Sequence, residues 1–318
     1  MENAPFPFTA DDRDYLRQYG LAIDEAQRQW SLLTHPPRSV ELERPCTVDD
    51  GIERLPEREH SVLAETHRKA AARGRWLKFV PASGAASRMF ALRSEEEQRQ
   101  FCQSLDRFAF ADDARQELAD QGIDVDKLIG AARYEEVVEA VVAPDRLGYG
   151  QTPKGLLPFH SYPDERRTAF EEHLLEAGDC FAAGANGVHA HFTVGSDSRE
   201  AFARQLQQFR AARGDSRSDV SFSVQRPSTD TIAMSGDGDL LRDEDRTPVL
   251  RAGGHGSLIE NLNALRGDLI FVKNIDNVAH QHARAPSLAW IQILGGYLVR
   301  LQDAIHQHLH ALHNADDT

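Results

Sequence analysis

The sequence predicts an α/β domain built on a mostly parallel sheet with helices on both faces. Three observations support this. Short apolar runs such as Trp76 to Ala82 and Asp268 to Asn274 are typical of buried strands. Stretches of helical period separate these runs, and alternating strands and helices favour a parallel sheet. The 318 residues are 41% hydrophobic, which is enough for a sizeable core.

The first part of the chain predicts helices. Residues 9–34 begin with Thr9 as a cap, continue with an acidic first turn and place apolar residues at helical spacing. Prolines break 36–56, and a second helix is expected over 58–73. We therefore expect a helical extension before the first strand.

The remaining elements are expected to alternate between strand and helix. Residues 91–145 are rich in Glu, Gln, Arg and Ala and predict an inserted helical cap. The elements expected after it are a helix over 164–178 ending at Gly178, a strand over 189–194, a helix over 197–213, a strand over 220–225, a loop over 235–247, a helix over 257–265, the strand over 268–274 and a long helix over 286–313. This order predicts three parts: a helical extension 1–74, an α/β core 75–285 with the helical insertion 91–145, and a C-terminal helix 286–318.

Charge and composition limit the function classes. The net charge of −14 disfavours nucleic acid or an anionic membrane as the main partner. No stretch approaches the ~18 apolar residues of a membrane span, and the N-terminus lacks a signal-peptide pattern, so we expect a cytoplasmic protein. Three widely spaced cysteines argue against a disulfide framework or a thiolate metal site.

Lysine is scarce in this chain, with 5 Lys against 31 Arg. A surviving lysine can mark a position where the broad, planar arginine fork does not fit. Two of the five, Lys154 and Lys273, lie inside the motifs described next. Both are therefore candidate catalytic residues.

A loop rich in small residues follows the strand at 76–82. Its backbone N–H groups can approach an anion closely, and an arginine at its end can clamp a phosphate. The alternative is a tight strand-to-helix turn with an exposed arginine. The candidate phosphate-binding residues are Ser83, Gly84, Ala85, Ser87 and Arg88.

Two further motifs place charges next to strands. Lys154 lies between Pro153 and Gly155, where a compact ammonium could reach phosphate oxygens. Asp276 follows the strand at 268–274, where one carboxylate can hold Mg²⁺ and leave positions for phosphate oxygens. The alternatives are a surface lysine in a Pro/Gly turn and an Asx turn that closes the strand.

A glycine-rich loop surrounds one histidine later in the chain. Gly253, Gly254, His255 and Gly256 offer a flat backbone surface for a base or sugar, or simply a loop that leads into the next helix. Asp230 is the second candidate for a metal or sugar ligand, with a hydrogen-bonded turn as the alternative.

Two histidine groups could be considered as metal sites. His189 and His191 would point to the same side of a strand, but no third ligand lies nearby, so packing or substrate contact is the preferred interpretation. The terminal helix carries four histidines, interpreted as a solvated or interface surface: His306, His308, His310 and His313.

Five segments together resemble a known family. FVPASGAASRMF, KGLLPFH, STDTIA, GGHGSLIENLN and FVKNIDN resemble, over most of the chain, a bacterial family catalogued as domain of unknown function 4301. The order of the glycine/serine loop, the PKGLLP segment, the GGHG loop and the NIDN strand end also resembles sugar-1-phosphate nucleotidyltransferases of the UDP-sugar pyrophosphorylase type, over roughly residues 76–280.

That resemblance implies a Rossmann-like GT-A nucleotidyltransferase sheet and a magnesium-dependent reaction. A sugar phosphate, or a similar phosphorylated molecule, would attack the α-phosphorus of a nucleoside triphosphate and release pyrophosphate. Ser83, Gly84 and Arg88 would hold the triphosphate and Lys154 would contact the phosphates. Gln225 would read the base with the glycine loop at 253–256, and Asp276 would hold Mg²⁺.

This chain departs from the common transferases in two ways. SGAASRM lacks their second glycine, and Lys154 lies 66 residues after Arg88 instead of a few. A non-catalytic nucleotide or nucleotide-sugar binding protein on the same fold is therefore the alternative. A glycosyltransferase ranks last, because the expected Asp-x-Asp pair is replaced by NIDN.

Overall fold

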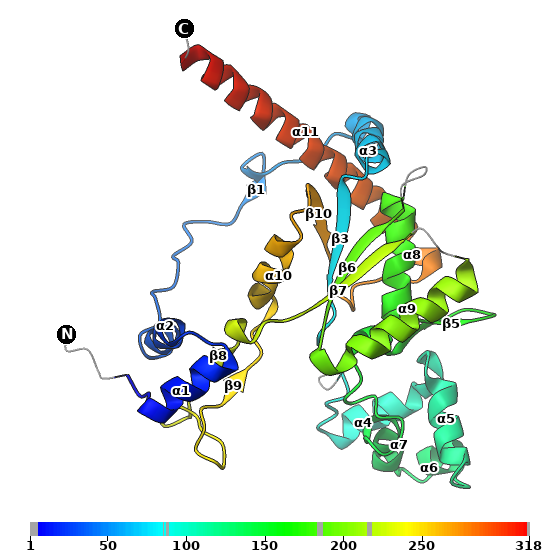
Figure 1. Ribbon diagram of the computed structural model, residues 1–318. Helices are drawn as coiled ribbons and strands as arrows, with labels where there is room; N and C mark the ends of the chain where they lie inside the picture. The colour runs from blue at the N-terminus through cyan, green and yellow to red at the C-terminus, as the bar shows by residue number, and fades with distance from the viewer. Residues whose placement is uncertain (1–5, 85, 87–88, 183–186, 215–217, 317–318) are drawn as a thin grey trace. The chain divides into compact units, whose positions relative to one another are not determined.

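A computed structural model describes residues 6–84, 86, 89–182, 187–214 and 218–316 of the chain (Figure 1). The chain folds as two compact units. The large unit comprises Pro56–Val224 and Arg266–Thr318, and the small unit comprises Met1–Leu55 and Gln225–Leu265. Among the residues described, none of the helices combines the length and apolarity needed to cross a lipid bilayer.

A parallel four-stranded sheet forms the centre of the large unit. All three neighbouring pairs are parallel. The prediction of an α/β fold with a mostly parallel sheet flanked by helices is therefore confirmed. In spatial order the strands are β10 (Leu269–Val272), β3 (Trp76–Pro81), β6 (His189–Val194) and β7 (Asp219–Val224).

One face of this sheet forms the main core. Because side chains alternate along a strand, Lys78 of β3 shares its face with Phe192 of β6 and Phe222 of β7. Phe170 and Phe202, from two helices on this face, contact the ring of Phe222. The helices of the large unit that pack around this core are α8 (Ala169–Phe181), α9 (Arg199–Arg213), α3 (Glu57–Ala72) and α11 (Ala285–Asp316).

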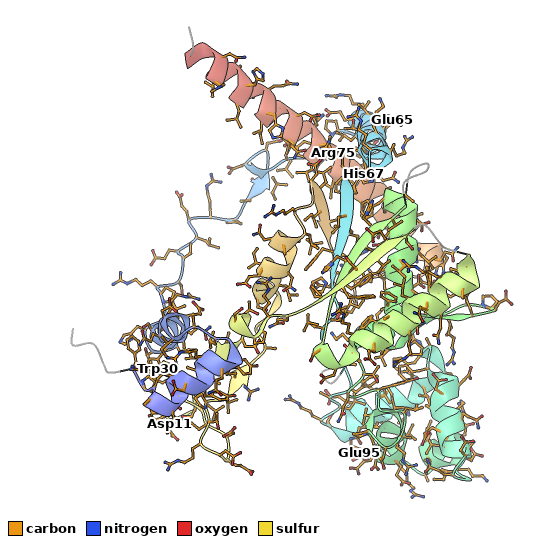
Figure 2. All side chains as sticks on the ribbon, in the orientation of Figure 1. Asp11, Trp30, Glu65, His67, Arg75 and Glu95 are labelled. Carbon is orange, nitrogen blue, oxygen red and sulfur yellow. The ribbon has the colours of Figure 1, made fainter. Side chains whose placement is uncertain are left out.

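Helices α3 and α11 pack closely because α11 carries two adjacent glycines. A Cβ atom on Gly296 would lie 1.8 Å from the carbonyl oxygen of Leu63 in α3. A Cβ atom on Gly295 would lie 2.4 Å from Nδ1 of His67, which is labelled in Figure 2. Only glycine fits at these two positions, so the sequence fixes where α11 crosses α3.

The predicted insertion forms a helical group with its own apolar core. Phe101, Leu118 and Val141 are buried within it. Tyr149 donates a hydrogen bond to Asp113 at 2.8 Å, and Arg166 pairs with the same carboxylate at 2.8 Å. The α-helices of this group are α4 (Glu95–Gln103), α5 (Ala111–Ala119), α6 (Val125–Gly130) and α7 (Tyr134–Val142), and the short strands that follow it are β4 (Pro158–Ser161) and β5 (Arg166–Thr168).

The small unit joins the N-terminal residues to a later segment. Asp12 pairs with Arg242 at 2.7 Å, and Tyr19 donates to Asp230 at 2.7 Å. These bonds group residues 225–265 with the N-terminus, whereas the sequence prediction assigned them to the core. The elements of this unit are α1 (Ala10–Tyr19), α2 (Ile23–Thr34), β1 (Thr47–Val48), β2 (Gly51–Ile52), β8 (Thr231–Ile232), β9 (Leu250–Arg251) and α10 (Ile259–Ala264).

Three predicted helix boundaries were wrong. The helix expected over 9–34 is two helices, because Gly20 adopts a left-handed conformation with φ of 102° and ends α1. The helix expected over 164–178 begins only at Ala169, because Arg166–Thr168 pair with β4 as β5 and Thr168 caps the helix, and it continues to Phe181. A glycine inside a helix costs only about 1 kcal/mol, and the burial of Cys180 and Phe181 outweighs that cost.

Candidate functional site

The loop after β3 is joined to the segment that carries Lys154. The backbone N–H of Lys154 donates to the carbonyl of Gly84 at 3.2 Å, and that of Ala86 donates to Thr152 at 3.1 Å. Residues separated by about 70 positions in the sequence therefore lie side by side at the carboxyl end of the sheet. Open parallel sheets bind their ligands at this end.

Lys154 also contacts the residue that follows β10. Its Nζ atom lies 2.8 Å from Oδ2 of Asp276, and the two side chains are 20% and 41% exposed. Gly155 lets the segment approach the core, since a Cβ atom there would lie 2.9 Å from the ring of Phe202 and 3.2 Å from Ile275. The structure thus brings Gly84, Lys154 and Asp276 together.

Lys273 lies in a different, largely buried set of charges. Its Nζ atom lies 2.5 Å from Oε2 of Glu176, and Lys78 donates to the other oxygen of the same carboxylate at 2.8 Å. Burial alone would raise the pKa of Glu176, but the two ammonium groups outweigh it and lower that pKa. Burial lowers the pKa of Lys78 to about 8 although Glu176 opposes the change. Glu176 is therefore the shared counter-charge of two lysines.

Two side chains of helix α8 hold the segment that leads to Asp276. Nε2 of His173 donates to the carbonyl of Ile275 at 3.1 Å, while Glu176 holds Lys273 one turn further along α8. Burial lowers the pKa of His173 well below its usual value, and the nearby lysines lower it further, so its ring is neutral. The two neighbours of Asn274 are therefore tied to one helix, Lys273 through its side chain and Ile275 through its carbonyl.

The sequence prediction missed Lys78, His173 and Glu176. Two signals pointed towards them. His173 and Glu176 are three residues apart and so share a helix face, and Lys78 is one of only five lysines. A lysine in an apolar strand nevertheless needs a buried partner, and only the packing of α8 on the sheet identifies that partner.

A second buried carboxylate lies on the same helix. Glu172 accepts hydrogen bonds from Tyr162 at 2.6 Å and from Nδ1 of His160 at 3.0 Å. Arg284, just before α11, pairs with its other oxygen and with Asp179. These contacts tie the hairpin of β4 and β5 to the start of α11.

In the small unit, Asp230 is held by two neutral donors. Tyr19 donates to one oxygen at 2.7 Å and Gln225 donates to the other at 3.1 Å. The hydrogen bond to Asp230, reinforced by burial, raises the pKa of Tyr19 to about 12. Gln225 and Asp230, both predicted ligand contacts, thus bind each other in this unit.

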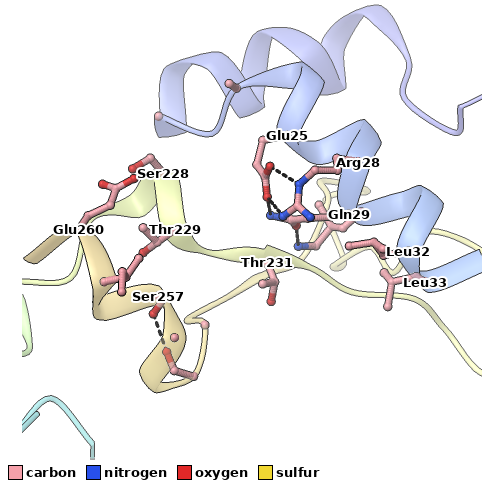
Figure 3. A pocket seen from close by; sticks show the side chains of 17 residues that line it. Glu25, Arg28, Gln29, Leu32, Leu33, Ser228, Thr229, Thr231, Ser257 and Glu260 are labelled. Carbon is pink, nitrogen blue, oxygen red and sulfur yellow. Dashed lines mark hydrogen bonds and ion pairs between the residues drawn. The ribbon is translucent and has the colours of Figure 1, made fainter. Parts of the chain in front are cut away.

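The glycine loop lines a pocket of about 880 Å³ within the small unit (Figure 3). Arg28, Gln29 and Leu32 of α2 form part of its wall, together with residues 228–232. Arg28 makes two hydrogen bonds of 2.7 Å to Glu25 beside the pocket. The volume of the pocket is ordinary for a small-molecule site. The pocket's remaining wall includes Gly253, Gly254 and Gly256.

Gly253 is the member of this loop that must be glycine. A Cβ atom there would lie 2.9 Å from the carbonyl oxygen of Thr229 and 2.9 Å from Ser257. Gly254 and Gly256 have open space at the same position. The loop is therefore packed at its first glycine and accessible at the other two.

The structure does not describe every residue that the sequence predicts as a ligand contact. Ala85, Ser87 and Arg88 lie outside the described residues, as does the side chain of His255. In the same loop as the first three, Ser83 is half-buried and Gly84 is exposed, with open space where a Cβ atom would be.

The strand histidines pair with their neighbours. His191 bonds the hydroxyl groups of Ser221 and Ser223, both at 2.8 Å, and burial lowers its pKa. His189 lies 3.3 Å from a carboxylate oxygen of Asp219. Within the described part of the chain, no three His, Cys, Asp or Glu side chains gather where they could hold a metal ion.

Comparison with known proteins places the chain in a family. The family model described as "Domain of unknown function (DUF4301)" matches residues 9–318. Among solved structures, the chain is similar to the uridine diphosphate N-acetylglucosamine pyrophosphorylase of Trypanosoma brucei, with 14% identity and a TM-score of 0.41. The match covers 76% of this chain and 38% of that chain. None of the curated proteins matches.

Proposed function

We propose that this chain, which belongs to the DUF4301 family, binds the phosphates of a nucleoside triphosphate at the carboxyl end of the large unit's sheet. It transfers the nucleotidyl group to a phosphorylated small molecule, such as a sugar phosphate, and releases pyrophosphate. The observation that supports this is the meeting of Gly84, Lys154 and Asp276 from three distant segments. Accessible backbone N–H groups and a compact ammonium can bind phosphate oxygens, and a carboxylate beside them can hold the Mg²⁺ that accompanies the phosphates.

In this proposal Lys154 neutralises phosphate charge. Its ammonium has three donors, so it can retain Asp276 and still donate to a phosphate oxygen. The attacking phosphate oxygen forms a bond to the α-phosphorus, and the bond to the departing pyrophosphate breaks. This displacement depends on alignment and charge neutralisation more than on a general acid or base.

Asp276 suits a magnesium ion. Mg²⁺ is usually held by one or two carboxylates with substrate phosphates and water in its other positions, and Asp276 is an accessible carboxylate beside the proposed phosphate site. When bound, the ion would neutralise charge on the phosphate oxygens. Asp230 fits less well, because each of its oxygens already accepts a hydrogen bond from a neutral donor.

The geometry favours a positioning role for Lys273. Its side chain is 11% exposed and its ammonium is bound to Glu176, whereas Lys154 is more accessible. In the proposal Lys273 fixes the start of the loop that ends in Asp276, and Lys154 contacts the ligand. Substituting the two lysines separately distinguishes these roles.

The test measures ligand binding and turnover separately. Nucleoside triphosphates and nucleotide sugars are screened by thermal shift with and without Mg²⁺, and pyrophosphate release is assayed with a panel of sugar phosphates. A ligand present at ~100 times its Kd stabilises the folded protein by about 2.7 kcal/mol, which is a readable shift in melting temperature.

The variants test the two side chains of the proposed site. We expect Lys154→Met and Asp276→Asn to lower turnover about 10²–10³-fold. Exposed Lys127→Met and Asp303→Asn are the matched controls.

Two results would change the conclusion. Ligand binding without pyrophosphate release from any pair would favour the non-catalytic binding protein. A screen with no shift at all, in a folded protein, would remove the phosphate site and the proposed function with it.

A further inference from the structure

Helix α11 carries a long exposed stripe of large apolar residues. Their spacing is four, four and three residues, repeated twice, so the pattern recurs after 11 residues. At 3.6 residues per turn this confines them to an arc of about 100° along the helix. We call these residues, whose exposed fractions are 41–65%, the apolar stripe: Trp290, Leu294, Leu298, Leu301, Ile305, Leu309 and Leu312.

The stripe is not the side by which α11 joins its own unit. Ile293 and Val299 are buried outside the arc of the stripe, and Gly296, which lies opposite the middle of that arc, packs against α3. Figure 1 shows α11 continuing past α3 towards the C-terminus, and residues 305–314 are all exposed. An isolated helix end is marginal in water, so the burial of this stripe would stabilise the last turns.

The charge pattern around the stripe points to a second copy of the chain. Between Ser287 and Asn314 the only residues with permanent charge are Arg300 and Asp303, although the whole chain carries −14. The acidic surfaces of the rest of the chain repel those of a second copy. Two α11 helices can meet along the apolar stripe without bringing carboxylates of the two copies face to face. Helices that bind anionic membranes instead carry several Lys and Arg on their polar face.

The repeat itself also favours self-association. An 11-residue repeat corresponds to about 3.67 residues per turn, close to the 3.6 of an α-helix, so two helices that pack along it coil around each other with a slight right-handed twist. From Trp290 to Leu312 the stripe runs about 33 Å at 1.5 Å per residue. Contiguous exposed apolar surface of this kind is a feature of interaction sites. Two identical stripes are self-complementary about a two-fold axis.

We propose that the apolar stripe of α11 is a homodimer interface in which α11 of one copy packs against α11 of a second copy. This goes beyond the proposed function and does not depend on it. The interface lies on the face of α11 opposite α3, so dimerisation leaves the buried core of the large unit unchanged.

The experiment is sedimentation velocity on the full chain between 1 and 100 µM, assay concentrations chosen around typical dimer affinities. We expect twice the chain mass of 35.5 kDa. The double variant Leu309→Glu/Leu312→Glu should raise the dimer dissociation constant at least 100-fold, because it places four charges per dimer in the interface. Gln307→Glu, two residues away and on the opposite side of the helix, should leave the dimer intact.

Several outcomes would overturn the proposal. A wild-type chain that remains monomeric at 100 µM would overturn the proposal. Flotation of the monomer with vesicles that contain anionic lipid would assign the stripe to a membrane surface. A dimer unaffected by Leu309→Glu/Leu312→Glu would place the interface elsewhere. Because both leucines lie outside the core, an unchanged thermal melt verifies that the variant folds.

Discussion

Nε2 of His173 lies 3.1 Å from the carbonyl oxygen of Ile275, the residue immediately before Asp276. A neutral, fully buried ring on α8 thereby fixes the backbone that presents the proposed metal ligand. The position of Asp276 consequently depends on the packing of α8 as well as on its own strand.

His173→Phe should loosen this loop. The variant keeps an aromatic ring but removes the donor, so the Ile275 carbonyl loses its partner at a cost of about 1–3 kcal/mol. Hydrogen–deuterium exchange should become at least about tenfold faster over residues 273–278, with the β6 peptide as the internal reference. Unchanged exchange in this segment would show that the strand alone holds it.

Glu176→Gln should strongly destabilise the large unit. The change leaves Lys78 fully buried without its counter-charge and removes the carboxylate that binds Lys273. Breaking a buried pair in this way costs about 3–5 kcal/mol, measurable by urea unfolding. Exposed Glu135→Gln is the control and should stay within about 0.5 kcal/mol.

The double variant Lys78→Met/Glu176→Gln tests the reason for that loss. Removing both buried charges should recover part of the stability, since no ammonium is then left unpaired at position 78. A double variant that is no more stable than Glu176→Gln alone would argue that shape, and not charge, determines this cluster.

Gly155→Ala should destabilise the segment that carries Lys154. The added methyl group meets the Phe202 ring at 2.9 Å, and overpacking of this kind costs about 1–3 kcal/mol. Gly178→Ala is the matched control: it lies inside α8 with open space at its Cβ position, so it should gain up to about 1 kcal/mol. Equal melting temperatures for the two variants would contradict the close contact at Gly155.

The pair of Asp12 and Arg242 should make the small unit sensitive to acid. The hydrogen bond from Arg242 lowers the pKa of the buried Asp12 from 3.8 to about 2. Because the folded pKa lies below the unfolded one, the stabilisation is complete above about pH 4 and disappears as pH falls through 2. It amounts to roughly 2 kcal/mol.

Arg242→Gln checks this sign and range. Denaturant unfolding followed by circular dichroism between pH 2 and 7 should show a gap between wild type and variant at neutral pH. The gap should narrow below pH 4 as Asp12 becomes protonated in both proteins. A gap that is constant over the whole range would mean that Arg242 stabilises through its other contacts, such as the carbonyl of Arg246.

The elements of the sheet were predictable because their signals are local. Trp76 to Pro81 and Leu269 to Val272 are apolar runs next to glycines or turn residues, and each forms a strand close to its expected bounds. Helix ends were less predictable. Gly20 ends a helix through its left-handed conformation, whereas Gly178 lies inside one because the residues after it are buried.

The sequence by itself determined the parallel α/β class, the inserted helices and the motifs that contain Lys154 and Asp276. Only the tertiary structure decided which of these residues meet. Lys154 and Asp276 are 122 positions apart, and Lys78 and Glu176 are 98 apart. Such pairings depend on how strands order in the sheet and which helix covers them. Those arrangements are set by the burial of apolar surface over the whole unit, which no local pattern encodes.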